Sequence, residues 1–375
     1  MEFRDLKRQY RALQTEIDAG MREVIRNTDF ISGKKVSELE EKLASDTGVK
    51  HVISCANGTD ALSLALMAWG IGPGDAVFVP DFTFFASGEA VALQGAAPVF
   101  VDVREDTFNL DPDKLKKAVE NVFRGKKWIP KAILAVDLFG QPAEYEALRK
   151  VADEYGLLLL EDGAQGFGGR IHGKKACSFG DIATTSFFPA KPLGCYGDGG
   201  AVFTNSDTWA ELIRSYCIHG KGRYKYDNVR IGINSRLDTM QAAVLLAKYD
   251  AFQSYELEQV NRIADRYAQL LPECVKIPVI REGYRSSWAQ YTIQLSNEQE
   301  RNSLQEYLKC HGVPGMVYYP KPMHRQKAFE PYDMDEQDLT VTEELCKKVL
   351  SLPMHPYLED DEIMQIAELI REWAG

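Results

Sequence analysis

Three short loops carry residue types that can do chemistry, and each follows a run with β-strand character. The first reads Cys55-Ala56-Asn57-Gly58-Thr59-Asp60 and leads into a helical stretch. A glycine-containing turn at a helix N-terminus offers free backbone N–H groups and a dipole that suits a phosphate. A plain helix cap made by Asn57 or Thr59 would explain the same residues without any ligand.

The second loop, Glu161-Asp162-Gly163-Ala164-Gln165, follows the apolar run Leu157–Leu160. A carboxylate at the end of a buried strand costs free energy unless a cation or donors meet it. The residues therefore predict either a partner with positive charge or, equally, a helix cap or an internal ion pair.

The third loop, from Ser186 to Gly194, places Lys191 among phenylalanine, proline and leucine side chains, and a glycine-rich stretch follows at Gly197-Asp198-Gly199-Gly200. Most single lysines are solvated. An apolar setting, however, lowers the pKa of an ammonium group by desolvation, as an imine-forming amine requires. Lys191 is our candidate catalytic residue.

Together the loops supply a phosphate cradle, a carboxylate and a buried amine. This set of groups is what a protein needs to hold pyridoxal 5'-phosphate (PLP), and the combination is far more specific than any one loop.

The elements that must position these loops alternate between short β-rich runs and longer helical stretches, which predicts an α/β fold with a mostly parallel sheet and helices on both faces. In such sheets, ligands bind at the carboxyl ends of the strands. The expected strands are Val52–Ser54, Ala76–Val79, Pro98–Val103, Ala132–Val136, Leu157–Glu161, Ala183–Phe187 and Ala201–Thr204. The expected helices are Leu6–Asn27, one after Gly33, Asp60–Trp69, Phe85–Gln94, Pro112–Asn121 and Ala143–Tyr155.

A helical pattern from Thr239 to about Leu271 precedes a change of character, so we expect a large PLP-binding domain with N-terminal helices over residues 1–250. Residues 251–375 are expected to form a smaller α+β domain. Its expected strands are Val275–Ile280 and Tyr291–Leu295, and its expected helices are Ser303–His311 and Asp360–Trp373.

The composition excludes several classes of function. The 375 residues include 44 Lys plus Arg against 55 Asp plus Glu, a net charge of −11. An acidic chain without a basic block is a poor binder of nucleic acid or of an anionic membrane surface. It contains no apolar run near the roughly 20 residues of a membrane span. Its seven cysteines include no C-x-x-C pair, which argues against a disulfide framework or zinc site. We expect a cytoplasmic protein with no metal.

The three loops, in this order, resemble the sugar aminotransferases of the DegT/DnrJ/EryC1/StrS family. The likeness extends from Phe3-x-Asp5-Leu6 to Leu352-Pro353-Met354-His355-Pro356-Tyr357, nearly the whole chain. It implies the PLP fold type I (aspartate aminotransferase-like) architecture. It also implies a homodimer whose active sites are shared between subunits.

The same resemblance implies a role for each residue of the loops. Lys191 would bond to PLP as a Schiff base and then move a proton, Asp162 would pair with the ring nitrogen, and Gln165 would hydrogen-bond the ring hydroxyl oxygen. The residues implied to hold the phosphate are Gly58, Thr59, Ser186 and, from the partner subunit, Asn234.

Further residues resemble the family's aromatic and sugar-binding positions. Phe84 would stack on the ring, although a core aromatic explains it otherwise. His219 and Arg236 would face the nucleotide sugar, with an intersubunit salt bridge an equal alternative for Arg236. The segment Tyr318-Tyr319-Pro320-x-Pro322-Met323-His324 resembles a loop that enters the neighbour's site, where Tyr318, Tyr319 and His324 would bind substrate.

Within the family, the motifs are most similar to enzymes that aminate C3 of UDP-2-acetamido-2-deoxy-3-oxo-glucuronate with L-glutamate, forming pyridoxamine phosphate (PMP) during turnover, for O-antigen and other surface polysaccharides. That subgroup reads His-Tyr-Pro where this chain has Tyr318-Tyr319-Pro320, and the cations Lys221, Arg223, Lys225 and Arg230 also differ. A UDP- or dTDP-linked 3-keto or 4-keto deoxysugar therefore stays open as substrate.

Two other functions of the same fold are less compatible with the sequence. A PLP-dependent sugar dehydratase would replace the lysine with histidine, and a non-catalytic regulator would be expected to lose Lys191, Asp162 or Gln165. All three residues are present.

Overall fold

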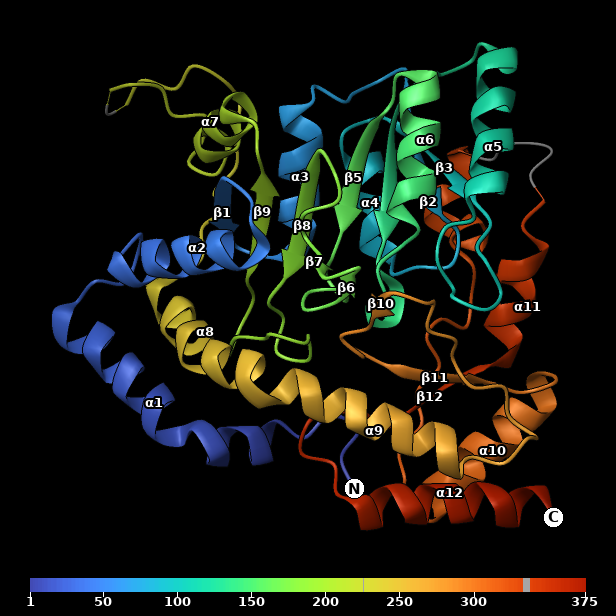
Figure 1. The fold of residues 1–375 in the computed structure, drawn as a ribbon. Coiled ribbons are helices and arrows are strands. Elements are labelled where there is room, and N and C mark those ends of the chain that lie inside the picture. The colour runs from blue at the N-terminus through green and yellow to red at the C-terminus, as the bar shows by residue number, and fades with distance from the viewer. Residues whose placement is uncertain (225, 333–337) are drawn as a thin grey trace.

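A computed structural model describes residues 1–224, 226–332 and 338–375 of the chain. Its centre is a seven-stranded sheet with helices on both faces (Figure 1). In spatial order the strands are β1 (His51–Cys55), β9 (Gly200–Thr204), β8 (Ile182–Ser186), β5 (Leu158–Asp162), β4 (Ile129–Val136), β2 (Asp75–Pro80) and β3 (Ala97–Val101). Only β9 runs antiparallel to its neighbours in this sheet, so the predicted mostly parallel α/β architecture is confirmed.

Side chains that alternate along the strands feed separate cores on the two faces of the sheet. In β4, Leu134 joins the core with helices α3 and α4, while Ile133 and Ala135 join the core with α5 and α6. Burial on both faces explains the near-continuous apolar runs of these strands. The helices around the sheet are α1 (Leu6–Asn27), α2 (Lys34–Thr47), α3 (Gly58–Ala68), α4 (Phe85–Leu93), α5 (Pro112–Gly125), α6 (Tyr145–Tyr155), α7 (Asp207–Tyr216) and α8 (Thr239–Ala251).

The long predicted helix from Thr239 contains an irregular turn. Helix α8 continues through a π-helical turn, η2 (Phe252–Glu256), into α9 (Leu257–Leu270), which crosses the lower part of the molecule in Figure 1. Beyond it a second core forms between α9, strands β11 (Tyr291–Gln294) and β12 (Val349–Leu352), and helices α10 (Glu298–Cys310) and α12 (Asp360–Ala374). This second core lies in the segment that we assign to the small domain.

In the C-terminal third one predicted strand is wrong, and both helix α11 (Thr340–Lys348) and strand β12 were not predicted. Residues 275–280 form no strand, because only Lys276 bridges to Gln294 and the chain then leaves the sheet. Instead β12 pairs with β11, directly after helix α11 (Thr340–Lys348). The remaining short elements are η1 (Leu138–Gly140), η3 (Met323–Arg325), η4 (Lys327–Tyr332), β6 (Arg170–Ile171), β7 (Lys174–Lys175) and β10 (Tyr284–Arg285).

Among residues 1–224, 226–332 and 338–375, no helix is both long and apolar enough to cross a membrane. Within the same ranges, no group of three or more His, Cys, Asp or Glu side chains could hold a metal ion.

Candidate active site

The sheet brings the three predicted loops together at one edge. Strands β1 and β8 both pair with the antiparallel β9, and Gly200 at the start of β9 lies opposite both Cys55 and Ser186. A Cβ atom on Gly200 would lie 2.4 Å from the carbonyl oxygen of Asn57. Glycine at this position is therefore what allows the first and third loops to approach each other.

The first loop forms both a helix cap and an open helix end. The side chain of Asn57 accepts a hydrogen bond from the N–H of Asp60 at 2.8 Å, so the predicted cap is real. The N–H groups of Gly58 and Thr59 belong to the first turn of α3 and have no acceptor within the helix. A Cβ on Gly58 would lie 2.7 Å from the Cβ of Ser186, so the helix end directly faces the Ser186 side chain. This arrangement is suited to a phosphate.

Asp162 ends strand β5 as a buried carboxylate that faces the site. It accepts hydrogen bonds from the hydroxyl of Ser87 at 3.1 Å and from the N–H of Ala164 at 3.2 Å. Burial raises the pKa of Asp162, and the nearby charge of Lys191 opposes that rise. A cationic group placed against this carboxylate would offset the cost of burying it.

The preceding residue, Glu161, points to the other side of the strand and has a structural role. It accepts hydrogen bonds from the backbone N–H groups of Cys177, Phe179 and Gly180. Burial raises the pKa of Glu161 to about 7. The hydrogen bonds of Glu161 are thus to the backbone of the turn at 177–180, and the carboxylate that faces the site is Asp162.

Lys191 sits in a tight turn at the carboxyl end of β8. Its backbone N–H donates to the carbonyl of Phe188 at 2.8 Å. Burial lowers the pKa of the Lys191 amine, and the charge of Asp162 partly restores it. The lowered pKa agrees in direction with the expectation from the sequence, and it favours a reactive, uncharged amine.

Gln165 links the second loop to the aromatic side of the site. Its Oε1 atom accepts the N–H of Phe139 at 2.7 Å, and its Nε2 atom donates to the Tyr319 hydroxyl at 3.2 Å. The ring of Tyr319 lies 6.3 Å from that of Phe84. Phe84 is 55% exposed, so the alternative that it is a core aromatic is wrong, and its ring is available to a ligand.

Two expectations for the segment around Tyr318 need correction. Tyr319 contacts Gln165 of its own chain, so this segment contributes to its own site rather than the neighbour's. The ring of His324 faces Asp81, with Nδ1 2.6 Å from Oδ2, and its Nε2 lies 3.4 Å from Glu343. Both ring nitrogens face carboxylates, which indicates a structural tie instead of substrate binding. Tyr318 is half-buried beside Phe3.

The predicted partner-facing residues form a separate group beside the phosphate loop. The Asn234 Oδ1 atom accepts a hydrogen bond from Arg236 at 2.7 Å. Between them, the hydroxyl of Ser235 accepts the N–H of Ala56 at 3.0 Å, which fixes this segment against the first loop. Exposed His219 lies on the paired strand-like segment. The roles predicted for these side chains stay predictions, and Lys225 lies outside the described residues.

Sequence reasoning missed Ser87 and Arg4. Ser87 lies one helical turn after Thr83 and holds Asp162, a role that only the strand–helix packing reveals. Arg4 donates to the backbone carbonyl of Lys191 at 2.7 Å across 187 positions of sequence. Its only sequence signal was its place inside the Phe3-x-Asp5-Leu6 motif.

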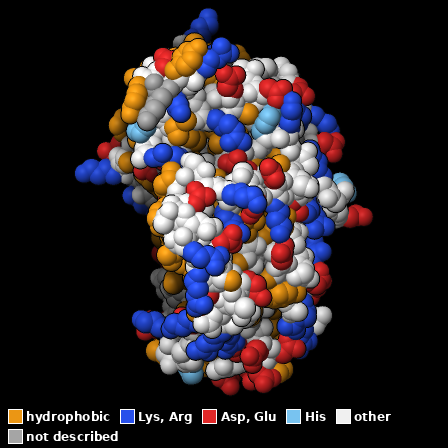
Figure 2. Space-filling model, turned by 90° about the vertical axis from the view of Figure 1, so that its left-hand side faces the viewer, with side chains coloured by type: hydrophobic (Ala, Val, Ile, Leu, Met, Phe, Trp, Pro, Cys, Tyr) orange, Lys and Arg blue, Asp and Glu red, His pale blue; other side chains and the backbone are white. Residues whose placement is uncertain are grey.

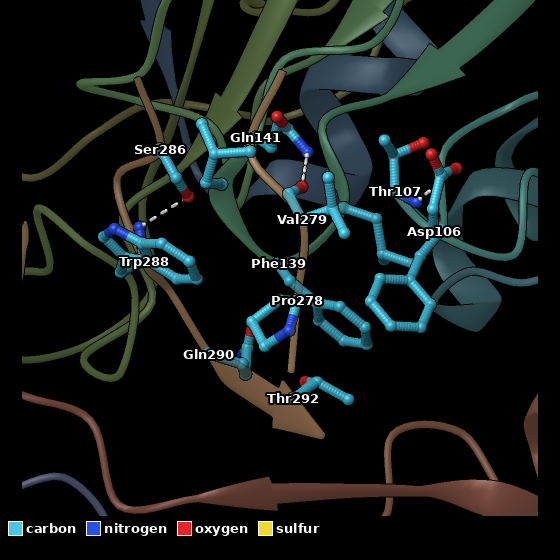
Figure 3. Close-up of a pocket in the computed structure, with 13 residues that line it drawn as sticks. Asp106, Thr107, Phe139, Gln141, Pro278, Val279, Ser286, Trp288, Gln290 and Thr292 are labelled. Atoms are coloured by element: carbon cyan, nitrogen blue, oxygen red, sulfur yellow. Dashed lines mark hydrogen bonds between the residues drawn. The ribbon is translucent and has the colours of Figure 1, made fainter. Parts of the chain in front are cut away.

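A pocket elsewhere is distinct from this site. Figure 3 shows it between η1 and the segment that leads to β11, with Phe139, Pro278 and Trp288 among its lining residues. None of its thirteen lining residues, all described, is one of the predicted site residues. The site of Lys191, in contrast, has the groups that suit PLP, namely the N–H donors of an open helix end for the phosphate, a buried carboxylate that can accept from the ring nitrogen, and an amine.

Comparison with known proteins gives matches over the full chain. The model of the DegT/DnrJ/EryC1/StrS aminotransferase family matches residues 11–371. A UDP-2-acetamido-2-deoxy-3-oxo-D-glucuronate aminotransferase from Pseudomonas aeruginosa is 45% identical, covering 97% of each chain. The crystal structure of a DegT DnrJ EryC1 StrS aminotransferase from Brucella abortus has a TM-score of 0.97 and 47% identity, covering 100% of each chain. That of NtdA from Bacillus subtilis with bound cofactor PMP has a TM-score of 0.87 and 29% identity, over 96% of this chain and 82% of the other.

Proposed function

The chain belongs to the DegT/DnrJ/EryC1/StrS aminotransferase family, and we propose that it is a PLP-dependent enzyme that moves an amino group from L-glutamate to a keto group of a nucleotide-linked sugar. The observation that carries this proposal is the convergence of Lys191, Asp162 and Gln165 beside the open end of α3. PMP bound to a structural relative supports the cofactor.

When bound, PLP supplies an electron-poor ring that stabilises negative charge on the substrate carbon. The work left to the chain is binding, orientation and proton movement. Asp162, fixed by Ser87 and the N–H of Ala164, holds a proton on the ring nitrogen. Lys191 would bond to the cofactor through its amine and would move a proton at the substrate carbon. Gln165 orients the ring through its hydroxyl oxygen.

The phosphate is held by the N–H groups of Gly58 and Thr59 together with the hydroxyl of Ser186. Phe84, exposed next to Tyr319, covers one face of the ring. We assign Tyr318, Tyr319 and Arg236 to the sugar nucleotide, and Tyr319 acts within its own chain.

We further propose a homodimer, with Asn234, Arg236 and His219 reaching the partner's site. The segment that precedes Asn234 supports a dimer, because its apolar side chains are strongly exposed. Ile231, for example, is 90% exposed, while Asn234 itself forms a β-bridge with Ile218. Figure 2 shows hydrophobic side chains gathered at the top of this face, with Lys, Arg, Asp and Glu intermixed over the rest. The exposed apolar residues of the segment before Asn234 are Tyr224, Tyr226, Val229 and Ile231.

The preferred acceptor is UDP-2-acetamido-2-deoxy-3-oxo-glucuronate, aminated at C3, in the biosynthesis of a surface polysaccharide. The relative from Pseudomonas aeruginosa supports this choice by its identity and coverage. Arg236 provides a cation for the sugar carboxylate or the diphosphate.

One observation favours a second candidate, an uncharged UDP- or dTDP-linked keto sugar. The position that carries histidine in the glucuronate subgroup is Tyr318 here, a neutral phenol that is half-buried. A phenol donates one hydrogen bond but brings no positive charge to a carboxylate.

The test is to give PLP-loaded protein L-glutamate and either the 3-oxo-glucuronate or its neutral 3-oxo-N-acetylglucosamine counterpart, both UDP-linked. Mass spectrometry would detect the amino sugar. We expect amination of the glucuronate at the higher kcat/KM. A preference for the neutral sugar would select the second candidate, and no amination of any keto sugar nucleotide would refute the function.

A further inference from the structure

Two cations from outside the Lys191 loop hold its backbone at both ends. The Arg4 guanidinium donates to the carbonyl oxygen of Lys191 at 2.7 Å, and the Lys248 ammonium donates to that of Gly194, also at 2.7 Å. Arg4 belongs to the segment before α1, and Lys248 lies on α8. Hydrogen bonds from two distant parts of the sequence thus hold the first and the last residue of the stretch from Lys191 to Gly194.

Lys248 is withdrawn from water and Arg4 is half-buried, although both side chains are long enough to reach solvent elsewhere. The Lys248 side chain is almost fully buried and lies over the ring of Tyr196. Burial lowers the pKa of Lys248 to about 8 and that of Arg4 to about 10. A buried charge persists only where its interactions offset the desolvation cost, so the two hydrogen bonds to the loop are constrained contacts.

One buried carboxylate acts on both cations. The charge of Glu256 raises the pKa of Arg4 and of Lys248 against the effect of burial. Glu256 itself accepts hydrogen bonds from the Gln9 amide at 2.9 Å and from the Tyr357 hydroxyl at 2.7 Å. Glu256 also lines a small cavity together with Arg4 and with Pro192 of the lysine loop, so α1, the loop before α12 and the lysine loop meet around this carboxylate.

Glu256 is the last residue of the π-helical turn η2 between α8 and α9. Such turns are rare and are found mostly at functional sites, because they redirect the side chains of an otherwise regular helix. The turn lies between Lys248 and the start of α9, at the junction with the small domain.

The loop itself is tightly folded and sensitive to backbone position. A Cβ atom on Gly194 would lie 2.5 Å from the carbonyl of Pro189, so the chain passes close to itself there. The carbonyl and the amine of Lys191 belong to one residue. A shift of the carbonyl would therefore also move the amine relative to Asp162.

We propose that Arg4 and Lys248, with Glu256 as their shared counter-charge, are positioning residues that fix the Lys191–Gly194 backbone and so aim the Lys191 amine at the cofactor. This inference rests on the proposed role of Lys191 as the cofactor-bonding lysine. It assigns a function to the N-terminal Phe3-x-Asp5-Leu6 motif and to the π-helical turn.

The test uses the full chain with the variants Arg4→Gln, Arg4→Lys, Lys248→Met and Glu256→Gln. Arg8→Gln is the matched control, because Arg8 lies four residues after Arg4, in the first turn of α1, but donates to Glu362 at 2.8 Å and to the Tyr357 carbonyl at 2.9 Å instead of the lysine loop. Two quantities are measured. They are amide hydrogen exchange of the peptide 188–196 without added cofactor, and the rate at which added PLP bonds to Lys191, followed by absorbance.

We expect Arg4→Gln and Lys248→Met to slow cofactor bonding by about tenfold or more and to speed exchange of the loop peptide by a similar factor. Arg4→Lys, which keeps one donor, should restore most of the rate. Arg8→Gln should lower the thermal midpoint yet leave both quantities within about twofold of wild type.

Wild-type rates and exchange in Arg4→Gln and Lys248→Met would overturn the inference, as would equal effects of Arg8→Gln. If Lys248→Met does not fold, Arg4→Gln decides between these outcomes, with Arg4→Lys as its rescue. Glu256→Gln is expected to change both quantities in the same direction as Arg4→Gln. Failure of the wild-type protein to bond PLP would instead refute the proposed function, and the exchange measurement would still show whether the cations hold the loop.

Discussion

At the scale of single residues, the two adjacent carboxylates of the second loop have different tasks because β5 alternates its side chains between faces. Glu161 satisfies three backbone N–H groups of the turn at 177–180, while Asp162 faces Lys191. The alternation along the strand places Glu161 and Asp162 on opposite faces. It does not tell which of the two faces holds the site.

Replacement of the lysine tests the residue-scale assignment. Lys191→Ala should abolish turnover while PMP still binds, because the amine that bonds to the cofactor and moves the proton is gone. Intact-protein mass spectrometry after borohydride reduction measures the bond. A cofactor that remains attached to a lysine in this variant would refute the assignment.

Replacement of the carboxylate tests the pairing with the ring nitrogen. Asp162→Ala should weaken cofactor retention and slow both half-reactions by about 100-fold or more, as loss of a buried electrostatic partner does. Single-turnover absorbance with L-glutamate and then with a keto sugar measures each half. Glu161→Gln is the comparison. It should lower the free energy of unfolding and leave the absorbance of the bound cofactor nearly unchanged. Near-wild-type rates in Asp162→Ala would mean that another group protonates the ring.

At the scale of elements, the phosphate cradle that we propose joins the N-terminus of α3 to Ser186 at the end of β8. The close approach of Gly58 to Ser186 leaves no room for a side chain. The sequence indicated a glycine turn before a helix, but the partner strand that makes the glycine necessary became evident only from the sheet order β1-β9-β8.

Gly58→Ala should therefore raise the Kd for PLP about tenfold, because the new methyl group must displace Ser186 or the helix end. Titration of the apoprotein with PLP measures the Kd. Gly125→Ala is the control, since open space surrounds a Cβ at that position. Equal Kd values for both variants and wild type would remove Gly58 from the cradle.

Elements with a long apolar periodicity were predicted well. The predictions failed where contacts with neighbouring segments decide whether a strand forms. Helix α1 has the predicted bounds, Leu6–Asn27, because six apolar residues repeat at helical spacing. The expected strand at 275–280 is absent, and Pro278 within it lacks the N–H that a sheet ladder needs. Strand β12 was missed because its apolar residues directly follow the helical pattern of α11.

At the scale of the whole molecule, the tie between His324 and Asp81 fastens the segment before η4 to the carboxyl end of β2. Burial lowers the pKa of His324, but the hydrogen bond and charge of Asp81 raise it overall. A raised folded-state pKa contributes stability that is present below the unfolded value of about 6.5 and is lost as pH rises through the folded value.

The difference in unfolding free energy between wild type and His324→Asn should accordingly be about 1 kcal/mol larger near pH 6 than near pH 9. Urea unfolding at the two pH values measures it. A pH-independent effect of His324→Asn would mean that the tie is not ionic.

The chemistry of the site could be predicted because Lys191, Asp162 and Gln165 lie in local motifs at strand ends. The sequence did not predict which chain supplies Tyr319, because that depends on how residues 313–324 return across the sheet. The contact between Arg4 and the Lys191 carbonyl likewise joins residues 187 positions apart.

The measurement that tests the central claim most directly is the absorbance spectrum of the purified protein with PLP, before and after L-glutamate. The account predicts that the absorbance of lysine-bound PLP is replaced by that of PMP while 2-oxoglutarate appears. If lysine-bound PLP forms but does not respond to L-glutamate, the donor or the reaction class is wrong. If PLP does not bond to Lys191 at all, the central claim is contradicted.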